Sequence, residues 1–497
     1  MPLSDDVADG ARPPSFRRGV LFTGSGSAAN IAFLFLETMI AVRSLGPETF
    51  GVYAITVATV NFLVTAVDFG NKAALTKMIA GADRQQQMAL ANSALVFRLA
   101  VVAAASVVLL AAREVLALLD PSGLFRQLLI YLPLMLAVAS FDELLLGMLQ
   151  GFQSYRQLAL AQVLRSALRL SLTALLLLVL DLGVLALVYS WIVSFAVSAA
   201  YQYVALPSGK GFVFRRPLLE EVLRFGFPLQ ATRFLWFLLR RVDVLLLGAL
   251  AGPSSAAYFA VAVKIPEALQ NLSESFTAVY FPTMASLLST GRREQALQML
   301  RQSLSLISFA GAVGALIAVL FSREIIVLVF SETYAASSLA FALLMVALHM
   351  TLAVNLMGYT LTAAGYSGRS LGKNLWRTAL HLAGDVALIP ILSYTGPALA
   401  ALLSSYGTNP VALWLLRVSG LRFSAAPFVK QTLSLILCVG LYLWLMPSGL
   451  APKVAVLGLF VALNVGFAGI SPGDLRLVWP QGPSGQAGRV RGQAHHG

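Results

Sequence analysis

Two arginines and an aspartate interrupt an otherwise apolar stretch, FLLRRVDVLLLG at residues 237–248. Arg240, Arg241 and Asp243 stand where a charged side chain costs about 2.5–3.5 kcal/mol on membrane-insertion scales, so such groups normally face a bundle interior or a watery cavity. An arginine in a cavity can recognise an anion, because its planar guanidinium forms paired hydrogen bonds with a phosphate and stays protonated. The stretch therefore indicates binding of an anionic group.

Similar polar seams run along other apolar stretches. In a continuous helix, Gln230, Arg233, Arg240 and Asp243 share an arc of roughly 140°. Three further sets fall on one helix face each: Gln162, Arg165, Arg169 and Thr173; Lys264, Glu267, Asn271 and Glu274; and Lys373, Arg377, His381 and Asp385 at four-residue spacing. We interpret these seams as the walls of a central cavity.

The sequence predicts two groups of site residues. Seven basic residues inside apolar stretches are expected to bind a negatively charged head group: Arg240, Arg241, Arg233, Arg165, Arg169, Lys264 and Arg98. Five others are expected to couple an ion or to restrain the arginines: Asp243, Glu37, Asp385, His381 and Glu267. For His381, a hydrogen-bonded interior histidine is the simpler interpretation.

The alternative is that these charges pair across helices as static braces. The candidate pairs are Arg165 and Arg169 with Asp142 and Glu143, Arg240 with Asp243, and Lys264 with Glu267. Both interpretations stay open for any one residue. The set as a whole favours a cavity, since a close-packed apolar core would lose little by omitting all of these charges.

The surrounding elements are membrane helices. The chain has 497 residues, 58% of them hydrophobic and 11% charged, and a mean hydropathy of +0.80, outside the balance of soluble proteins. We predict an all-α polytopic membrane protein with about fourteen spans, because apolar stretches of about 20 residues recur throughout. They lie near 19–43, 48–70, 91–112, 126–150, 156–180, 183–205, 220–249, 254–285, 302–322, 338–364, 372–393, 396–417, 428–446 and 453–470. The first is interpreted as a retained span, since no small-residue cleavage site stands out behind its polar leader.

The basic residues predict the orientation. The net charge is +13, and the 35 basic residues concentrate in alternate loops, which places both termini in the cytoplasm by the positive-inside rule. That distribution accounts for most of the charge and leaves no support for nucleic-acid binding. Nothing indicates a cofactor. The lone Cys438 cannot form an internal disulfide, and His495 with His496 in a Gly/Pro-rich tail is a weak metal signal.

An internal repeat predicts the domains. LGPETFGVYAITV from Leu45 resembles AGPSSAAYFAVAV from Ala251 at an offset of 206 residues, and Glu37 falls on Asp243. An offset of six helices predicts two lobes, 1–206 and 207–425, related by an axis along the membrane normal. Two additional helices (426–471), interpreted as an appendage facing lipid, and a disordered cytoplasmic tail (472–497) complete the prediction.

Two segments carry a family resemblance. Residues 41–80 and 225–269 resemble the polysaccharide-biosynthesis (oligosaccharide flippase) family of the multidrug/oligosaccharidyl-lipid/polysaccharide exporter superfamily. The resemblance implies a bacterial inner-membrane protein that carries an undecaprenyl-diphosphate-linked sugar to the outer leaflet by alternating access between two six-helix bundles. In the related lipid II flippases, a cationic cavity holds the head group and two C-terminal helices line a groove for the lipid tail.

Expected partners are therefore the lipid-linked oligosaccharide, the bilayer and polysaccharide polymerase machinery, with the chain itself a monomer. One alternative is a multidrug exporter of the same superfamily driven by Na⁺ or H⁺, although organic cations would favour an acidic or aromatic cavity. Another is a membrane polymerase, ligase or lipid-linked glycosyltransferase. An enzyme of that class usually has a sizeable outer loop, and no outer loop here exceeds about fifteen residues. A built-in ATPase is not indicated, because a Gly-x-x-x-x-Gly-Lys loop is missing.

Overall fold

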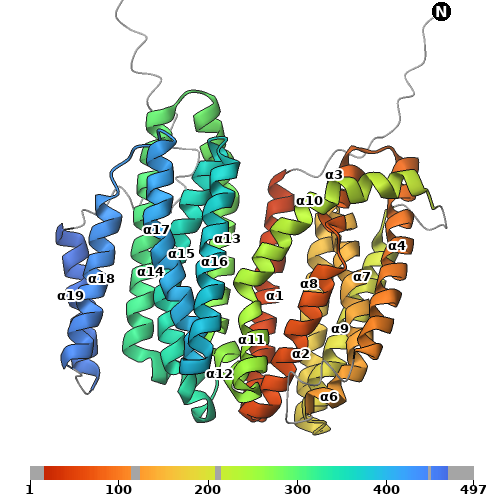
Figure 1. Ribbon diagram of the computed structural model, residues 1–497, viewed down its shortest axis with the longest axis horizontal. Helices are drawn as coiled ribbons and strands as arrows, with labels where there is room; N and C mark the ends of the chain where they lie inside the picture. The colour runs from red at the N-terminus through yellow and green to blue at the C-terminus, as the bar shows by residue number, and fades with distance from the viewer. Residues whose placement is uncertain (1–15, 113–123, 208–213, 446–448, 468–497) are drawn as a thin grey trace, which may run out of the picture. The chain divides into compact units, whose positions relative to one another are not determined.

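The computed structural model describes residues 16–112, 124–207, 214–445 and 449–467, and within these ranges every regular element is a helix (Figure 1). Eleven of the helices are long and apolar enough to cross a membrane. The prediction of an all-α polytopic membrane protein is confirmed. The predicted tail with His495 and His496, and most of the polar leader, lie outside the described residues.

The chain divides into two compact units. Unit 1 comprises the described residues up to 268 together with 326–337 and 385–397, and unit 2 comprises those of 269–325, 338–384 and 398 onward. The predicted division into lobes at residue 206 stays a prediction.

The first nine α-helices of unit 1 lie along the predicted spans, except one at residues 71–81, in a segment that the sequence did not predict to be a span. They are α1 (Phe16–Ser44), α2 (Pro47–Ala66), α3 (Asn71–Gly81), α4 (Arg84–Ala111), α6 (Leu124–Leu128), α7 (Leu132–Gly151), α8 (Tyr155–Ala174, continued by a π-helical turn at Leu175–Val179), α9 (Val184–Ala205) and α10 (Arg216–Arg240). Helices α11 (Val242–Ala251) and α12 (Pro253–Ala262) complete the set. Apolar side chains of α3, α4 and α7, such as Leu75, Leu90 and Met148, form a buried core.

Unit 2 contains most of the remaining helices. They are α13 (Lys264–Ser289), α14 (Arg293–Val329), α15 (Ser338–Ala363), α16 (Ser367–Leu392), α17 (Thr395–Val418), α18 (Ala426–Leu445) and α19 (Leu450–Phe467). The first residues of α13 and the last residues of α14 and α16 belong to unit 1. Helices α13, α14, α15, α17 and α18 share one apolar core.

The last two helices are more than a lipid-facing appendage. Leu435 and Cys438 of α18 and Phe460 of α19 are buried against α14. Gln431 of α18 also donates to the Ser305 hydroxyl of α14 at 3.1 Å. These apolar contacts and the hydrogen bond show that α18 and α19 pack on α14. The sequence analysis did not identify the buried face of α18, because both faces of this helix are apolar.

Two predicted spans are wrong in one respect, since each is broken into two helices. The predicted span 220–249 breaks at Arg241, whose backbone is non-helical (φ −138°, ψ −17°), between α10 and α11. The predicted span 254–285 breaks at Val263, between α12 and α13. Pro266 accounts for the second break, because proline is tolerated in the first turn of a helix and not in its interior. The break at Arg241 has no such local signal.

Equivalent helices of the repeat lie against each other within unit 1. Each begins with a Gly-Pro pair, so that Pro47 starts α2 and Pro253 starts α12. A Cβ atom at Gly51 of α2 would lie 1.8 Å from the carbonyl oxygen of Pro253. Glycine at this position therefore permits the close approach of the two helices.

Candidate functional site

A cavity of about 220 Å³ lies within unit 1. Its wall is formed by α1, α2, α8, α9, α11 and α12 and by the two helix breaks. The polar lining residues are Glu37, Thr38, Tyr53, Asn61, Arg169, Arg241 and Lys264. Charged groups from four of the predicted spans therefore reach one cavity.

Arg169 of α8 is held by two partners in the wall of the cavity. Its guanidinium donates to the Glu37 carboxylate of α1 at 3.2 Å and to the Tyr53 hydroxyl of α2 at 2.7 Å. Glu37 is 3% exposed, so the ion pair is shielded from solvent. The static-brace interpretation paired Arg169 with Asp142 or Glu143, whereas in the structure the ion-pair partner of Arg169 is Glu37.

The two helix breaks bring further cations to the cavity. Arg241, at the break between α10 and α11, forms an ion pair with Glu267 of α13. Lys264 is the first residue of α13, and its charged neighbours are Glu267, Arg241, Glu37 and Arg169. Interrupted helices commonly supply the ligand groups of membrane transporters. Here they place two basic residues that a continuous helix would orient differently.

The charges of this cluster do not cancel. Arg169, Arg241 and Lys264 face two carboxylates, those of Glu37 and Glu267. One positive charge is left over, and among the described residues Lys264 has no ion-pair contact of its own. The cavity can therefore accept an anionic group.

Aromatic side chains form the rest of the wall. They are Phe50, Trp191, Phe195 and Phe259. Trp191 stacks on Phe195 with ring centroids 4.0 Å apart, which holds both rings in fixed orientations. Flat apolar surfaces beside charged groups suit a ligand that combines an anion with sugar rings.

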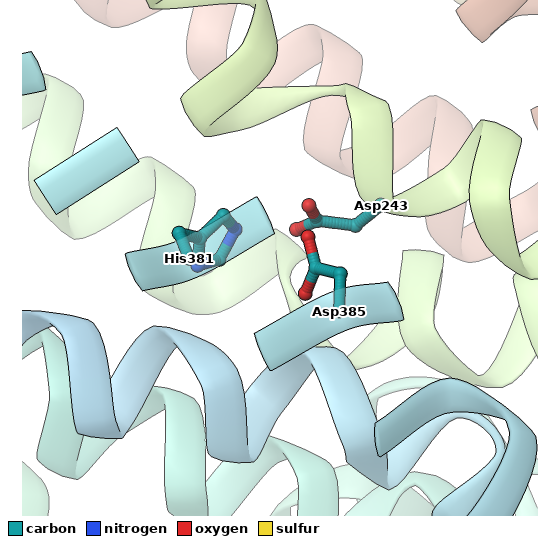
Figure 2. A group of neighbouring side chains, drawn as sticks. All are labelled: Asp243, His381 and Asp385. Atoms are coloured by element: carbon teal, nitrogen blue, oxygen red, sulfur yellow. The ribbon is translucent and has the colours of Figure 1, made fainter. Parts of the chain in front are cut away.

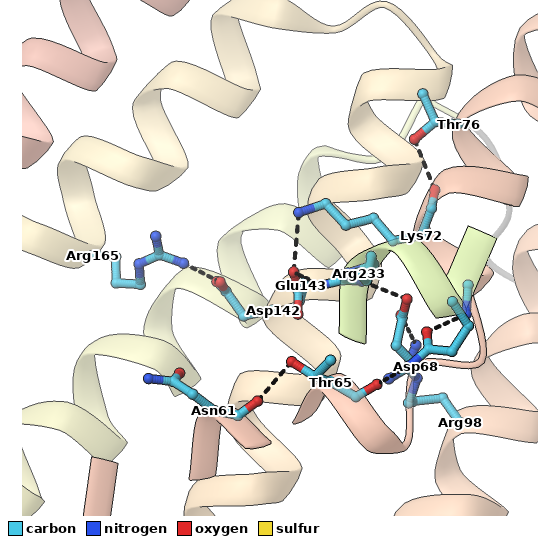
Figure 3. Close-up of polar contacts among 12 residues, drawn as sticks. Asn61, Thr65, Asp68, Lys72, Thr76, Arg98, Asp142, Glu143, Arg165 and Arg233 are labelled. Carbon is cyan, nitrogen blue, oxygen red and sulfur yellow. Dashed lines mark hydrogen bonds and ion pairs between the residues drawn. The ribbon is translucent and has the colours of Figure 1, made fainter. Parts of the chain in front are cut away.

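Three other predicted cations, Arg98, Arg233 and Arg165, are held elsewhere in unit 1, as Figure 3 shows. Arg98 of α4, 1% exposed, donates to Asp68 at 2.6 Å. Arg233 of α10 bridges Asp68 and Glu143 of α7, and Glu143 also accepts from Lys72 of α3 at 3.2 Å. None of these residues lines the cavity described above.

Arg165 of α8 forms an ion pair with Asp142 of α7, as the static-brace alternative predicted (Figure 3). Asp142 also accepts from Ser198 at 2.6 Å and from Gln202 at 2.5 Å, both on α9. A buried carboxylate with this many donors is well satisfied. The arrangement favours a bracing role for Arg165.

Two carboxylates meet in a separate part of unit 1. Asp243 of α11 and Asp385 of α16 are 6% and 0% exposed, and Figure 2 shows their carboxylate oxygens facing each other. His381 lies one turn before Asp385 on the same helix. Two buried carboxylates in contact require a shared proton or a cation. Asp243 and Asp385 are therefore the residues with the chemistry to hold an ion, and ion coupling stays a prediction.

The predicted arc on α10 is not continuous, because the helix ends before Asp243. The side chain of Arg240 lies outside the described residues, so its predicted role is left as a prediction. Arg241 is paired with Glu267, where we had expected Asp243 to restrain it.

Sequence reasoning missed Tyr53 and the aromatic wall. One signal was available, because Tyr53 aligns with Phe259 in the repeat, and both residues line the cavity. Ala54 and Ala260, which follow them, line it as well. Equivalent faces of α2 and α12 thus contribute to the same cavity.

Comparison with known proteins identifies the family. Residues 16–288, more than half of the chain, match the family model described as polysaccharide biosynthesis protein. The chain belongs to this family. A relative named "Putative O-antigen transporter" from Escherichia coli (strain K12) is 25% identical over 319 residues, which cover 62% of this chain and 73% of the relative.

Solved structures with the same fold are membrane transporters. The lipid II flippase MurJ in an inward closed conformation matches with a TM-score of 0.70 at 13% identity, over 92% of this chain and 100% of that one. An inward-facing multidrug resistance MATE transporter of the MOP superfamily matches with a TM-score of 0.64 at 19% identity, over 81% and 98% of the two chains. A MOP superfamily transporter from Pyrococcus furiosus matches with a TM-score of 0.54 at 18% identity, over 82% and 97%.

These likenesses confirm the resemblance seen in residues 41–80 and 225–269. The chain is a multi-span membrane protein of the polysaccharide biosynthesis family, and it has the fold of the MurJ and MATE transporters.

Proposed function

We propose that this protein is a flippase that moves an undecaprenyl-diphosphate-linked oligosaccharide, the repeat unit of a cell-surface polysaccharide, from the inner to the outer leaflet by alternating access. It acts in the bacterial cytoplasmic membrane with both termini in the cytoplasm, and passes its product to polysaccharide polymerase machinery. The relative named as an O-antigen transporter and the MurJ-like fold support this substrate class.

The observation that carries the proposal is the excess positive charge of the cavity in unit 1. Arg169 and Arg241 offer guanidinium groups, which suit the oxygens of a diphosphate. Lys264 adds a third cation to a cluster that has two carboxylates, those of Glu37 and Glu267. Binding the diphosphate would supply the negative charge that these residues lack.

The cavity volume limits which part of the substrate enters. About 220 Å³ is less than the roughly 300–1,000 Å³ of sites for drug-sized ligands, so a diphosphate and part of one sugar fit, and a whole oligosaccharide does not. The remaining sugars would extend beyond this cavity.

Energy for the outward step can come from the membrane potential. Each negative charge that moves outward gains about 2.3 kcal/mol per 100 mV of inside-negative potential. A diphosphate therefore moves in the favourable direction without an ATPase. Asp243 and Asp385 are candidates for an additional coupled ion.

A multidrug exporter of the same superfamily is the second candidate, favoured by the aromatic wall of the cavity. An organic cation would be repelled by the excess positive charge. Binding of pyrophosphate and of tetraphenylphosphonium to the purified full-length protein separates the two functions. We expect pyrophosphate to raise the midpoint temperature of unfolding, and the combined variant Arg169→Gln, Lys264→Gln to lose that effect. Stabilisation by tetraphenylphosphonium and not by pyrophosphate would favour the exporter.

A further inference from the structure

Helices α2 and α10 run in opposite directions and contact each other beyond the cavity of unit 1. The residues of α2 that line the cavity extend from Phe50 to Asn61. The next residue, Phe62, packs against Phe237 and Phe234 of α10, with ring centroids 5.5 Å and 6.1 Å apart. The contact between α2 and α10 therefore begins at the last turn of α2 that reaches the cavity.

Hydrogen bonds extend this contact to the end of α2. The side-chain amide of Gln230 on α10 donates to the carbonyl oxygen of Thr65 at 2.5 Å and accepts from the backbone N–H of Gly70 at 2.9 Å. Thr65 lies in the last turn of α2, and Gly70 lies in the turn between α2 and α3. Backbone groups at helix ends commonly lack intrahelical partners. One glutamine here bonds such a group at the end of α2 and another at the start of α3.

An ion pair joins the same two segments. Arg233 of α10 donates to the carboxylate of Asp68, in the turn between α2 and α3, at 2.5 Å (Figure 3). Asp68 is 0% exposed and Arg233 is 27% exposed, so the arginine lies at the edge of the buried network. Arg98 also pairs with Asp68. The buried carboxylate would therefore keep a charge partner if Arg233 moved away.

Glycines let the two backbones touch. A Cβ atom at Gly70 would lie 1.9 Å from the carbonyl oxygen of Gly226, and one at Gly226 would lie 2.8 Å from the carbonyl oxygen of Phe69. Alanine at either position would therefore push α10 away from the turn. A comparable contact occurs at the other end of α2, where Gly51 meets Pro253 of α12.

The turn between α2 and α3 is strained. Phe69 has a φ of +50°, in the left-handed region that bulky side chains rarely adopt. Such a conformation persists where the surrounding structure fixes it. Gln230 and Gly226 hold the backbone beside Phe69, and its ring packs against Phe97 of α4 with centroids 6.0 Å apart. Withdrawal of α10 would let the turn relax, so the strain favours release.

Helix α10 also contains a point at which it can bend. Pro228 lies inside α10, between Gly226 and Gln230. A proline inside a helix removes one backbone hydrogen bond and is a common cause of a kink. The segment that carries Gln230, Arg233 and Phe237 follows this proline. A bend at Pro228 would move these three side chains away from α2 together.

The contacts join the two predicted lobes, because α2 precedes residue 206 and α10 follows it. The segment after Gly70 carries Lys72, Lys77 and Arg84, which predict a cytoplasmic position for this end of α2. Alternating access requires that this end open while the substrate enters and close while it leaves. Contacts that hold the two predicted lobes together here must then break in each cycle.

We infer that α2 and α10 form a latch at the predicted cytoplasmic end of the cavity, and that its release admits the anionic head group. The inference rests on the proposed function and deepens it, because it names the contacts that control access to the cavity. The latch residues are Phe62, Thr65, Asp68 and Gly70 on one side and Gly226, Gln230, Arg233, Phe234 and Phe237 on the other.

The test measures how readily the cavity is reached from each side of the membrane. Cys438 is the one cysteine of the chain, so the variant Cys438→Ala, Asn61→Cys carries a single thiol at the cavity wall. A membrane-impermeant maleimide is added to inside-out vesicles, whose outer surface is the cytoplasmic one, and to right-side-out vesicles. The rate of labelling then reports access from each side and needs no substrate.

Weakening the latch should speed labelling from the cytoplasmic side. Gln230→Leu removes two hydrogen bonds and should raise the rate about tenfold or more in inside-out vesicles. Gly226→Ala should act in the same direction, because its methyl group meets the turn. Arg233→Gln should do so as well, since it removes the ion pair and leaves Asp68 with Arg98.

Each of these variants has a matched control on another part of the chain. Gln157→Leu changes a half-buried glutamine of α8, Gly81→Ala adds a methyl group that meets nothing within 4 Å, and Arg301→Gln removes an exposed charge of α14. All three should label at the rate of the parent protein.

Two results would overturn the inference. One is unchanged labelling in inside-out vesicles for correctly folded Gln230→Leu and Gly226→Ala. The other is an equal rise from both sides, because the contacts would then stabilise unit 1 without controlling access at one end. Pyrophosphate should protect the thiol by occupying the cavity. Failure of that protection, with labelling that still responds to Gln230→Leu, would count against the proposed function and not against the latch.

Discussion

The guanidinium of Arg169 donates at once to the Glu37 carboxylate and to the Tyr53 hydroxyl, so one side chain joins α8 to α1 and α2 at the wall of the cavity. This arrangement fixes the cation in place before any ligand arrives. The Glu37 carboxylate also partly neutralises Arg169, because it offsets one positive charge.

Glu37→Gln should therefore raise the affinity for pyrophosphate. Removing the carboxylate leaves Arg169 with the Tyr53 hydroxyl and gives the cavity a larger excess of positive charge. Isothermal titration of the purified protein measures the change, and Glu48→Gln, on the first turn of α2 outside the cavity, is the control. Weaker binding by a correctly folded Glu37→Gln would mean that the carboxylate contributes to the site through positioning alone.

Arg98→Met should destabilise the protein strongly. The substitution leaves the fully buried Asp68 with Arg233 as its one ion-pair partner among the described residues, and breaking a buried ion pair costs about 3–5 kcal/mol. Thermal unfolding in detergent checks this. Arg216→Met is the matched control, because its pair with Glu220 is exposed and such pairs contribute about 0–1 kcal/mol. Equal effects of the two variants would show that the buried network does not brace unit 1.

Gly51→Ala should reduce the amount of folded protein in the membrane, whereas Gly46→Ala should be tolerated. An added methyl group at Gly51 meets the Pro253 carbonyl, and at Gly46 it meets nothing within 4 Å. Quantitative immunoblotting of membrane fractions compares the two. Normal levels of Gly51→Ala protein would contradict the close packing of α2 on α12.

The predicted orientation is testable by reporter fusion. A reporter active only outside the cytoplasm should score at residues 46, 252 and 395 and fail at 84, 292 and 422, because the basic residues gather in the second set of segments. Fusions at 46 and 252 are equivalent positions of the repeat and should agree. Opposite results at these two positions would rule out a parallel repeat.

Much of the fold could be predicted from hydrophobic pattern alone. Spans of about 20 apolar residues locate the helices, and the Gly-Pro pairs at Gly46 and Gly252 mark the starts of α2 and α12. The break at Arg241 could not be predicted, because no proline or glycine stands there. The sequence analysis therefore assumed a continuous helix. The predicted shared face from Gln230 to Asp243 does not exist, because the helix breaks at Arg241.

The sequence predicted the type of site, a cationic cavity, but only some of the residues that line it. Intramembrane charge pointed to Arg169, Arg241 and Lys264, all of which line the cavity. The same signal also selected Arg98 and Arg233, which pair with Asp68. Sequence spacing within one helix cannot distinguish the two outcomes, because the partner carboxylate, Asp68, lies in the turn between α2 and α3, 30 residues from Arg98 and 165 from Arg233.

The central claim is that the positive cavity of unit 1 carries the diphosphate of a lipid-linked oligosaccharide across the bilayer. Its most direct test is the delivery of that lipid to the outer leaflet of proteoliposomes that contain the full-length protein, with and without a membrane potential. Wild type and Arg301→Gln should deliver it, faster when the potential is negative on the side of origin. Arg169→Gln, Lys264→Gln should be inserted normally and deliver almost none. Undiminished delivery by that double variant would contradict the account.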